Sequence, residues 1–305
     1  MTAASDSEPA GDFAGDPAGG FAGDLADDEV AVGLGRAQLL ADADRPGGYL
    51  LIIDRIRQSY VDLDDPTYID FEYMQYFSLV VNAIAPSAPA PLATTHVGGG
   101  AMAFARYLHA TRRGSSQLVL EPDAALTEWV RARLPLPRRS GIRVRPEFGR
   151  EGVAALRDAS ADLLVLDAFV GGRVPADLTT AEFMADVRRV LRPGGVLLAN
   201  VADGPPLTYV RRLLAGVGMS FAHRLAIADS SVLRGRRYGN IVLAASGEPL
   251  PEAALVRATA AFPFPTRLLG AHDVARFVAR ATPLTDEDAR RSPAPPDASW
   301  RVDVD

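Results

Sequence analysis

The chain has 305 residues, 48% of them hydrophobic, which suffices for one large core or two smaller ones. It has no run of 18 apolar residues and no secretory signal, so we expect neither membrane insertion nor export, and a cytoplasmic location. Cysteine and lysine are absent, which excludes disulfides, thiolate chemistry and Schiff bases, since all 32 basic residues are arginine.

The net charge of −6 is concentrated at the N-terminus, where residues 1–30 hold eight acids and no base. The remainder of the chain carries +2, and its arginines are dispersed, so no nucleic-acid-binding surface is predicted. Residues 1–30 consist mainly of Ala, Gly and Asp. Such a composition cannot bury enough apolar surface to offset the entropy of ordering, and it predicts a disordered acidic tail.

Residues 31–66 are predicted to form a small N-terminal β unit, because 49–63 are rich in β-branched and aromatic residues and favour one or two strands. The next stretch has apolar residues at helical spacing until Pro86 ends the pattern. The rest of 67–282 should form the main domain. From 283 the proline-rich sequence predicts a loosely attached tail, with Trp300 as the one residue suited to dock.

Apolar strands and amphipathic helices alternate from residue 92 onward, which predicts βαβ units in a parallel sheet. Strands are expected at 92–97, 117–121, 142–145, 162–167 and 195–201, and helices at 101–111, 123–133, 151–158 and 179–191. Two further strands within 220–228 and 238–246 should form a final antiparallel pair. The pattern is that of an α/β, class I methyltransferase-like (Rossmann-like), doubly wound sheet.

Three consecutive glycines, Gly98, Gly99 and Gly100, lie directly after a predicted strand and before a predicted helix. Glycine allows a tight turn and close approach of the backbone to a ligand. Glu121 ends the next strand, 21 residues beyond Gly100, the spacing at which an acid meets ribose hydroxyls in doubly wound folds. A plain turn and an exposed strand-end carboxylate are the structural alternatives, but the two features together favour a nucleoside site.

Asp167 ends the apolar strand LLVLD, so its carboxylate should emerge at the edge of the sheet where ligands bind in this architecture. It could act as a base, anchor a cation or cap the following turn. The histidines lack partners at metal-ligand spacing, and we expect structural roles for all four and no metal site: His96, His109, His223 and His272.

From about residue 54 to 246, the chain resembles the spermidine synthase (polyamine aminopropyltransferase) family. The segment IDRIRQ is similar to the family's LDG-x-x-Q and places Gln58 on the glutamine that contacts the donor. IDFEYMQ is similar to DEF-x-YHE and keeps Phe71 and Tyr73. LDAFVGGRVPADLTTAEFM resembles VDSSDP…LFT-x-EFY, with Asp167 on the catalytic aspartate.

The chain departs from the family pattern at several of these positions. Arg55 replaces a glycine, Met74 and Gln75 replace His and Glu, and Val170 replaces the second aspartate. In the segment PEFGREG, either Glu147 or Phe148 falls near the aspartate of the family's adenine-contacting GDA.

The resemblance implies transfer of an aminopropyl group from decarboxylated S-adenosylmethionine to an amine acceptor in polyamine biosynthesis. It also implies that the donor is held by Gln58, the three glycines, Glu121 and Asp167. Since an alkyl amine with a pKa of about 10.4 is protonated at neutral pH, a base must accept its proton. We assign that role to Asp167, with Tyr73 orienting the amine. Five acids are candidates to hold a second ammonium of the acceptor: Asp64, Asp65, Asp70, Glu72 and Glu182.

Two other functions remain open on the residues alone. The fold would equally serve a methyltransferase that uses intact S-adenosylmethionine, whose carboxylate would need a basic or backbone N–H partner. The substitutions at Met74, Gln75 and Val170 also fit a degenerate member that binds a nucleoside or polyamine without turnover. The resemblance further implies a homodimer, with the N-terminal β unit as a reasonable contact surface.

Overall fold

Two β-sheets and the helices packed on them make up the computed structural model, which describes residues 29–84 and 86–296. Most of the predicted acidic tail (residues 1–28), and Trp300 with the rest of 297–305, lie outside the described residues.

The N-terminal sheet has four antiparallel strands in the order β1-β2-β3-β4. β3 and β4 fall within the segment predicted to hold strands, and their hairpin turns through Asp54 and Arg55, both with positive φ. Two consecutive left-handed residues are typical of a type I′ turn, which matches the twist of the strands it joins. The strands are β1 (Val30–Val32), β2 (Gly35–Ala41), β3 (Gly48–Ile53) and β4 (Ile56–Asp62).

The main sheet has eight strands in the order β12-β10-β11-β9-β8-β5-β6-β7. The predicted βαβ run is present, with β5 to β9 parallel, and β10 and β11 form the predicted antiparallel pair. The strands are β5 (Ala93–Val97), β6 (Ser116–Leu120), β7 (Ile142–Arg145), β8 (Ala161–Leu166), β9 (Leu191–Asp203), β10 (His223–Asp229), β11 (Gly239–Ser246) and β12 (Thr266–Leu269).

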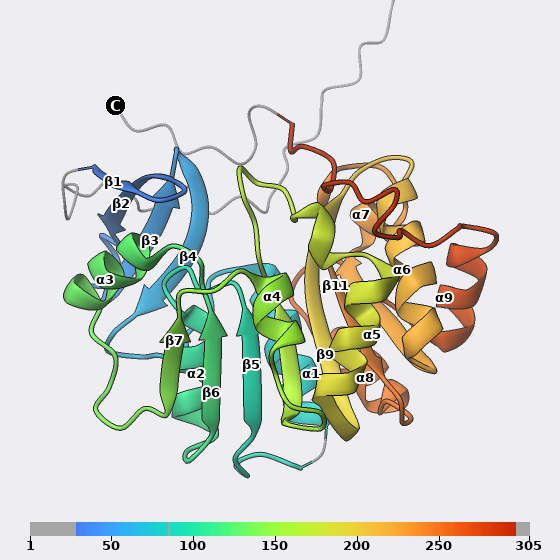
Figure 1. Cartoon of the computed structure of the whole chain (residues 1–305), viewed down its shortest axis with the longest axis horizontal. Helices are drawn as coiled ribbons and strands as arrows, with labels where there is room; N and C mark the ends of the chain where they lie inside the picture. The colour runs from blue at the N-terminus through green and yellow to red at the C-terminus, as the bar shows by residue number, and fades with distance from the viewer. Residues whose placement is uncertain (1–28, 85, 297–305) are drawn as a thin grey trace, which may run out of the picture.

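Helices cover both faces of this sheet, as Figure 1 shows, with α4, α5 and α6 in front and α1 and α2 behind. The helices are α1 (Glu72–Ala83), α2 (Ala103–Thr111), α3 (Ala124–Arg133), α4 (Gly149–Ala154), α5 (Ala181–Val190), α6 (Thr208–Ser220), α7 (Ser230–Leu233), α8 (Glu252–Thr259) and α9 (Ala271–Val278), with the short 3-10 helix η1 (Ala176–Leu178). The fold is therefore the expected doubly wound α/β architecture with an additional N-terminal antiparallel sheet.

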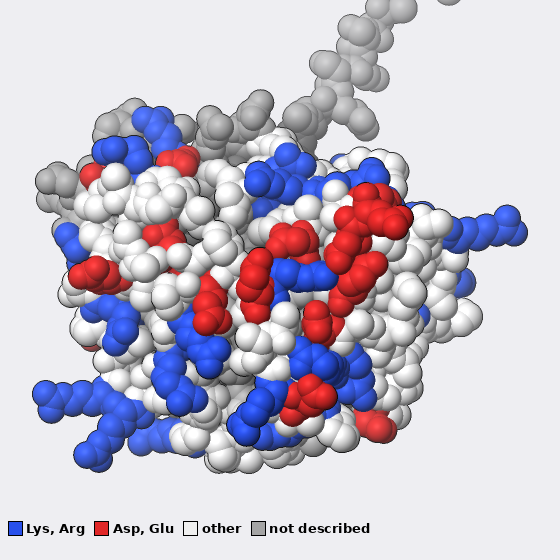
Figure 2. Space-filling view, in the orientation of Figure 1, with Lys and Arg blue, Asp and Glu red and all other residues white. Residues whose placement is uncertain are grey.

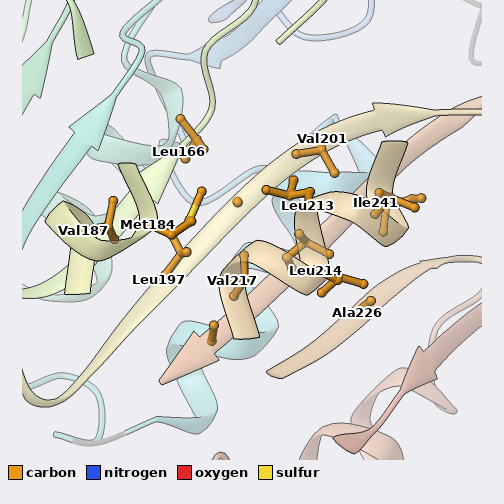
Figure 3. Packing of buried hydrophobic residues seen from close by; sticks show 14 of the residues in the cluster. Leu166, Met184, Val187, Leu197, Val201, Leu213, Leu214, Val217, Ala226 and Ile241 are labelled. Atoms are coloured by element: carbon orange, nitrogen blue, oxygen red, sulfur yellow. The ribbon is translucent and has the colours of Figure 1, made fainter. Parts of the chain in front are cut away.

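Separate apolar clusters hold these layers together. In the cluster drawn in Figure 3, Leu197 and Val201 of β9 meet Met184 and Val187 of α5 and Leu213 of α6. A second cluster lies on the opposite face, between α1, α2 and α8, and a third joins the N-terminal sheet to α2 and α3. Burial on both faces explains why the central strands have continuous apolar sequences.

Some elements differ from the sequence-based expectations. The helix expected at 101–111 begins at Ala103 because Met102 adopts a left-handed conformation with φ 58°. The helix expected at 151–158 spans Gly149–Ala154. Helices α6 to α9 and the edge strand β12 were not anticipated.

Residues 283–296 have no regular secondary structure, yet they lie against the main domain more closely than their proline-rich composition predicts. Leu284 and Ser292 are fully buried. The backbone of Ser292 bonds Val174 and the Arg173 side chain, and Arg212 pairs with Asp288. This stretch, here named the C-terminal strap, crosses the loop that follows β8.

Within the described part of the chain, no helix is both long and apolar enough to span a membrane. Basic and acidic side chains are interspersed over the face shown in Figure 2, and arginines gather at its lower left.

Candidate active site

A cleft of about 970 Å³ opens at the carboxyl ends of the parallel strands, between the main sheet and the N-terminal sheet. From β5 the chain winds outward through β6 and β7, then returns to place β8 on the other side of β5. The switch point of the sheet therefore lies between β5 and β8, which is where doubly wound folds bind ligands. The residues expected from the sequence to hold the donor or act in catalysis all line this one cleft: Gln58, Tyr73, Gly98, Gly99, Gly100, Glu121 and Asp167.

The glycine loop after β5 needs its glycines for conformation and for space. Gly98 and Gly100 have positive φ of 98° and 48°. A Cβ on Gly98 would lie 2.2 Å from the carbonyl oxygen of Asp167, so the loops after β5 and β8 meet at a distance that only glycine allows. The loop thereby presents bare backbone to the cleft.

Glu121 holds the glycine loop in place. One carboxylate oxygen accepts hydrogen bonds from the amides of Gly99 (2.9 Å) and Gly100 (3.3 Å), and the other accepts from the amide of Asp123 (3.0 Å). Burial raises the pKa of Glu121, and these amide donors oppose that rise. The acid at the predicted ribose-binding spacing thus also fixes the loop on which a nucleoside would lie.

Asp167 is partly buried at the switch point, with one donor on each carboxylate oxygen. The Tyr73 hydroxyl donates to Oδ2 and the Asn200 amide donates to Oδ1, both at 3.0 Å. Burial raises the pKa of Asp167 to about 6, although both hydrogen bonds favour the charged form. A carboxylate with such a pKa is ionised at neutral pH and remains basic enough to accept a proton.

Tyr73 reaches Asp167 from the first turn of α1, and its buried ring packs edge-on against Phe77. Burial and the neighbouring Asp167 carboxylate raise its pKa well above the ordinary value, so the phenol stays protonated and acts as a donor. Gln58 comes from β4, next to Ser59, whose hydroxyl accepts from the amide of Ala101 at 3.2 Å. The N-terminal sheet thus closes the cleft over the glycine loop.

The sequence left the register of the adenine-contacting segment open between Glu147 and Phe148, and the two residues differ in their position relative to the cleft. Phe148 lines the cleft at the N-terminus of α4 and is 63% exposed, whereas Glu147 does not line it. Of these two residues, Phe148 is therefore the one placed to contact a ligand in the cleft.

The charge of the cleft is predominantly negative. Eight acids and three arginines line it among the described residues. Two of the arginines face acids: Arg57 lies 3.0 Å from Asp70 and Arg237 lies 3.4 Å from Asp229. The acids are Asp54, Asp70, Glu72, Glu121, Glu151, Asp167, Asp177 and Asp229. This lining favours a cationic ligand over an anionic one.

The prediction that an acid of the cleft holds a second ammonium of the acceptor does not fit three of the five acids considered. Asp64 and Asp65 lie in the turn after β4, and Glu182 accepts from the amide of Asp286 at 3.1 Å; none of the three lines the cleft. Asp70 and Glu72 do line it, because the chain entering α1 crosses its mouth.

Sequence reasoning missed several polar residues of the cleft, among them Asn200, Asp229 and Asn240. The two asparagines interrupt apolar strands near the cleft, which is the signal that could have identified them.

His96 lines the cleft but is bonded within the sheet, with Nε2 2.9 Å from the Gln117 amide oxygen. Burial lowers its pKa to about 4, so it is neutral. Among residues 29–84 and 86–296, no group of three or more acids and histidines has an arrangement suited to a metal ion.

The fold and this cleft define a class I methyltransferase-like domain with a cleft at the switch point of its sheet. No family model matches the chain. It is 25% identical over 159 residues to the polyamine aminopropyltransferase of Chromobacterium violaceum, a match that spans 52% of this chain and 59% of that protein.

Solved structures extend the comparison over most of the chain. The crystal structure of a probable spermidine synthase from Corynebacterium glutamicum superposes with a TM-score of 0.79 and 30% identity, covering 85% of this chain and 96% of that one. Spermidine synthase from Thermotoga maritima shares the fold, with a TM-score of 0.54, 16% identity and coverage of 82% and 84%. The chain belongs to the spermidine synthase family.

Proposed function

We propose that this protein transfers the aminopropyl group of decarboxylated S-adenosylmethionine to an amine acceptor. The observation that carries the proposal is the Asp167 carboxylate, held by Tyr73 and Asn200 at the switch point of an acid-rich cleft. Membership of the spermidine synthase family supports the same reaction class.

The acidic lining favours the decarboxylated donor. Intact S-adenosylmethionine carries a carboxylate that needs a basic or backbone N–H partner. Of the three arginines that line the cleft, Arg57 and Arg237 already pair with acids, and Arg291 is the third. The decarboxylated donor presents only a sulfonium and an ammonium, which an acid-rich cleft stabilises. This distinction argues against the methyltransferase alternative.

The reaction requires little beyond alignment and one base. The neutral amine attacks the methylene next to the sulfonium, the new C–N bond forms as the C–S bond breaks, and the electron pair leaves on sulfur as methylthioadenosine. The proton lost by the amine passes to Asp167, while Tyr73 and Asn200 keep that carboxylate oriented. Because a sulfonium is already an activated leaving group, proximity supplies much of the acceleration.

Three ligands and one variant test the proposal. We expect calorimetric titration to show tighter binding of decarboxylated S-adenosylmethionine than of the intact form, and mass spectrometry to show an aminopropyl gain on an amine with release of methylthioadenosine. Asp167→Asn should bind the donor normally and abolish transfer. A methyl gain on any substrate, or donor binding without a product for any amine, would overturn the proposal.

A further inference from the structure

Four polar residues form a row across neighbouring strands of the cleft. Asp167 follows β8, Asn200 lies in β9, Asn240 in β11 and Asp229 ends β10, and these four strands are consecutive in the sheet. All four residues line the cleft.

The four side chains project from the same face of the sheet. The residues two positions away, Val165, Leu198, Val242 and Ile227, all belong to the apolar cluster that packs against α1. Because side chains alternate between the faces of a strand, the four polar residues also point toward α1. The row therefore lies opposite the first turn of that helix, which contributes Glu72 and Tyr73 to the cleft.

The two asparagines in the row each have an unused acceptor. Asn200 is 2% exposed, and its amide oxygen, like that of Asn240, is buried without a donor among the described residues. A buried acceptor without a donor is costly, so such groups mark places where a ligand or a water molecule supplies a hydrogen bond. Amide oxygens accept from ammonium groups, and Asn200 Nδ2 is already committed to Asp167.

Carboxylates stand at the far end of the row. Asp229 caps α7 and pairs with Arg237, and Glu72 bonds the Tyr76 hydroxyl. Burial raises the pKa of Glu72, the nearby Asp229 raises it further, and Arg237 lowers it. Two acids facing one arginine leave this end with a net negative charge, which suits a cationic group.

The row is longer than a short diamine. Three strand spacings, about 14 Å, separate the strand of Asp167 from that of Asp229. Asn240 lies opposite Ala202, so the row also steps two residues, about 7 Å, along the strands between Asn200 and Asn240. A four-carbon diamine spans about 6 Å between its nitrogens, since each bond is about 1.5 Å long. Such a diamine at Asp167 reaches Asn200 but not Asn240 or the acids beyond it.

On this basis, and resting on the aminopropyl transfer proposed above, we infer that the acceptor is a linear polyamine with at least three nitrogens. One terminal amine lies at Asp167, and the remaining ammonium groups extend along Asn200 and Asn240 toward Asp229 and Glu72. The amide oxygens and the distal acids thereby pair with these ammonium groups in a cleft where Val170 replaces the second aspartate of the family.

Binding and turnover together test the inference. Spermidine, a triamine, and putrescine, the four-carbon diamine, would be titrated calorimetrically into the full chain saturated with methylthioadenosine, and then compared as acceptors with the decarboxylated donor. We expect spermidine to bind at least tenfold more tightly and to have at least tenfold higher kcat/KM, since each ammonium paired with an acceptor adds about that factor.

Replacement of Asn240 should affect spermidine and putrescine differently. Asn240→Leu should remove the preference for spermidine and leave putrescine within about twofold, whereas Asn240→Asp, which keeps the acceptor oxygen, should retain the preference. Asn82→Leu on the exposed side of α1 is the matched control and should change neither amine. Thermal melting of each variant establishes that it is folded.

The outcomes separate this inference from the proposed function. Equal or better binding and turnover of putrescine would overturn the inference and leave aminopropyl transfer standing. Transfer to neither amine would count against the proposed function, and the binding preference would then decide the inference alone. A preference for spermidine that survives in Asn240→Leu would also overturn the inference.

Discussion

The hydroxyl of Tyr73 lies 3.0 Å from Oδ2 of Asp167, although 94 residues separate them in the chain. Tyr73 is in the first turn of the helix that follows the N-terminal sheet, and Asp167 follows the fourth parallel strand of the main sheet. Their contact joins the two parts of the cleft and orients the proposed base, and it lowers the pKa of Asp167 against the larger rise caused by burial.

Tyr73→Phe should lower kcat without weakening donor binding. A hydrogen bond to a charged group contributes about 1.5–3 kcal/mol, so we expect kcat to fall about 10- to 100-fold. Because the hydroxyl favours the charged carboxylate, its loss should also raise the pKa of Asp167 above the value of about 6 in the parent protein.

The pH profile of kcat/KM for the donor tests this effect. In the parent protein its acidic limb should have a midpoint near the Asp167 pKa of about 6, with activity rising as the pH rises through it. In Tyr73→Phe the midpoint should move to higher pH. Tyr68→Phe, at a partly exposed tyrosine that does not line this cleft, is the control. An unshifted limb with unchanged kcat would remove Tyr73 from the mechanism.

How far the sequence predicts this site depends on how local each signal is. Gly98 to Gly100 and Glu121 lie within one βαβ unit, so their spacing alone predicts their meeting. Asp167 is equally accessible to prediction because parallel strands end at a common edge. Asn200 and Asn240 show only as polar residues within apolar strands, because their proximity to each other depends on the antiparallel insertion of β11 between β9 and β10.

The same reasoning explains the C-terminal strap. Its composition predicts weak attachment, but Ser292 is held by partners more than 100 residues away, which no local pattern reveals. The acids considered for the second ammonium divide in the same way. Glu72 lines the cleft because α1 begins there, whereas Glu182 belongs to α5, which packs on the opposite face of the sheet from α1.

Asp167→Asn should stabilise the fold at neutral pH while it abolishes activity. The folded-state pKa of about 6 lies above the ordinary value of 3.8, so the parent protein loses stability as the pH rises through this interval and levels off above it. The neutral amide lacks this dependence. We expect the variant to be more stable by about 1–2 kcal/mol at pH 8, with the gain gone at pH 4, since one pKa unit corresponds to about 1.4 kcal/mol and the group is partly exposed.

Urea unfolding of both proteins at the two pH values measures this difference. Asp273→Asn, which removes a surface ion pair with Arg276, serves as the control and should shift stability by under about 1 kcal/mol. A gain for Asp167→Asn that is the same at pH 4 and pH 8 would show that charge burial is not its cause.

Phe148 should contribute to nucleoside binding by stacking on the base. Its ring is 63% exposed on the cleft wall, where a base in the cleft could cover it. Base–aromatic stacking is worth about 1–3 kcal/mol, so Phe148→Ala should weaken methylthioadenosine binding about 5- to 100-fold, and Phe148→Trp should preserve it.

Calorimetry on the folded variants gives these affinities directly. Met219→Ala is the matched control, because Met219 is 70% exposed and does not line the cleft. If Phe148→Ala binds methylthioadenosine as tightly as the parent protein, the base lies elsewhere in the cleft.

Ser292 should set the position of the loop that carries Val170. Its buried hydroxyl accepts from the amide of Val174 at 2.9 Å, so Ser292→Ala leaves that amide without a partner and should cost about 1–3 kcal/mol of stability. Because the loop from Ala168 to Pro175 lines the cleft beyond Asp167, its displacement should raise KM for the acceptor several-fold and leave the affinity for methylthioadenosine unchanged.

Steady-state kinetics with varied acceptor, calorimetry with methylthioadenosine and urea unfolding separate these effects, with Ser87→Ala at an exposed position as the control. An equal loss of donor and acceptor binding would show that the strap supports the whole cleft and not the acceptor side alone.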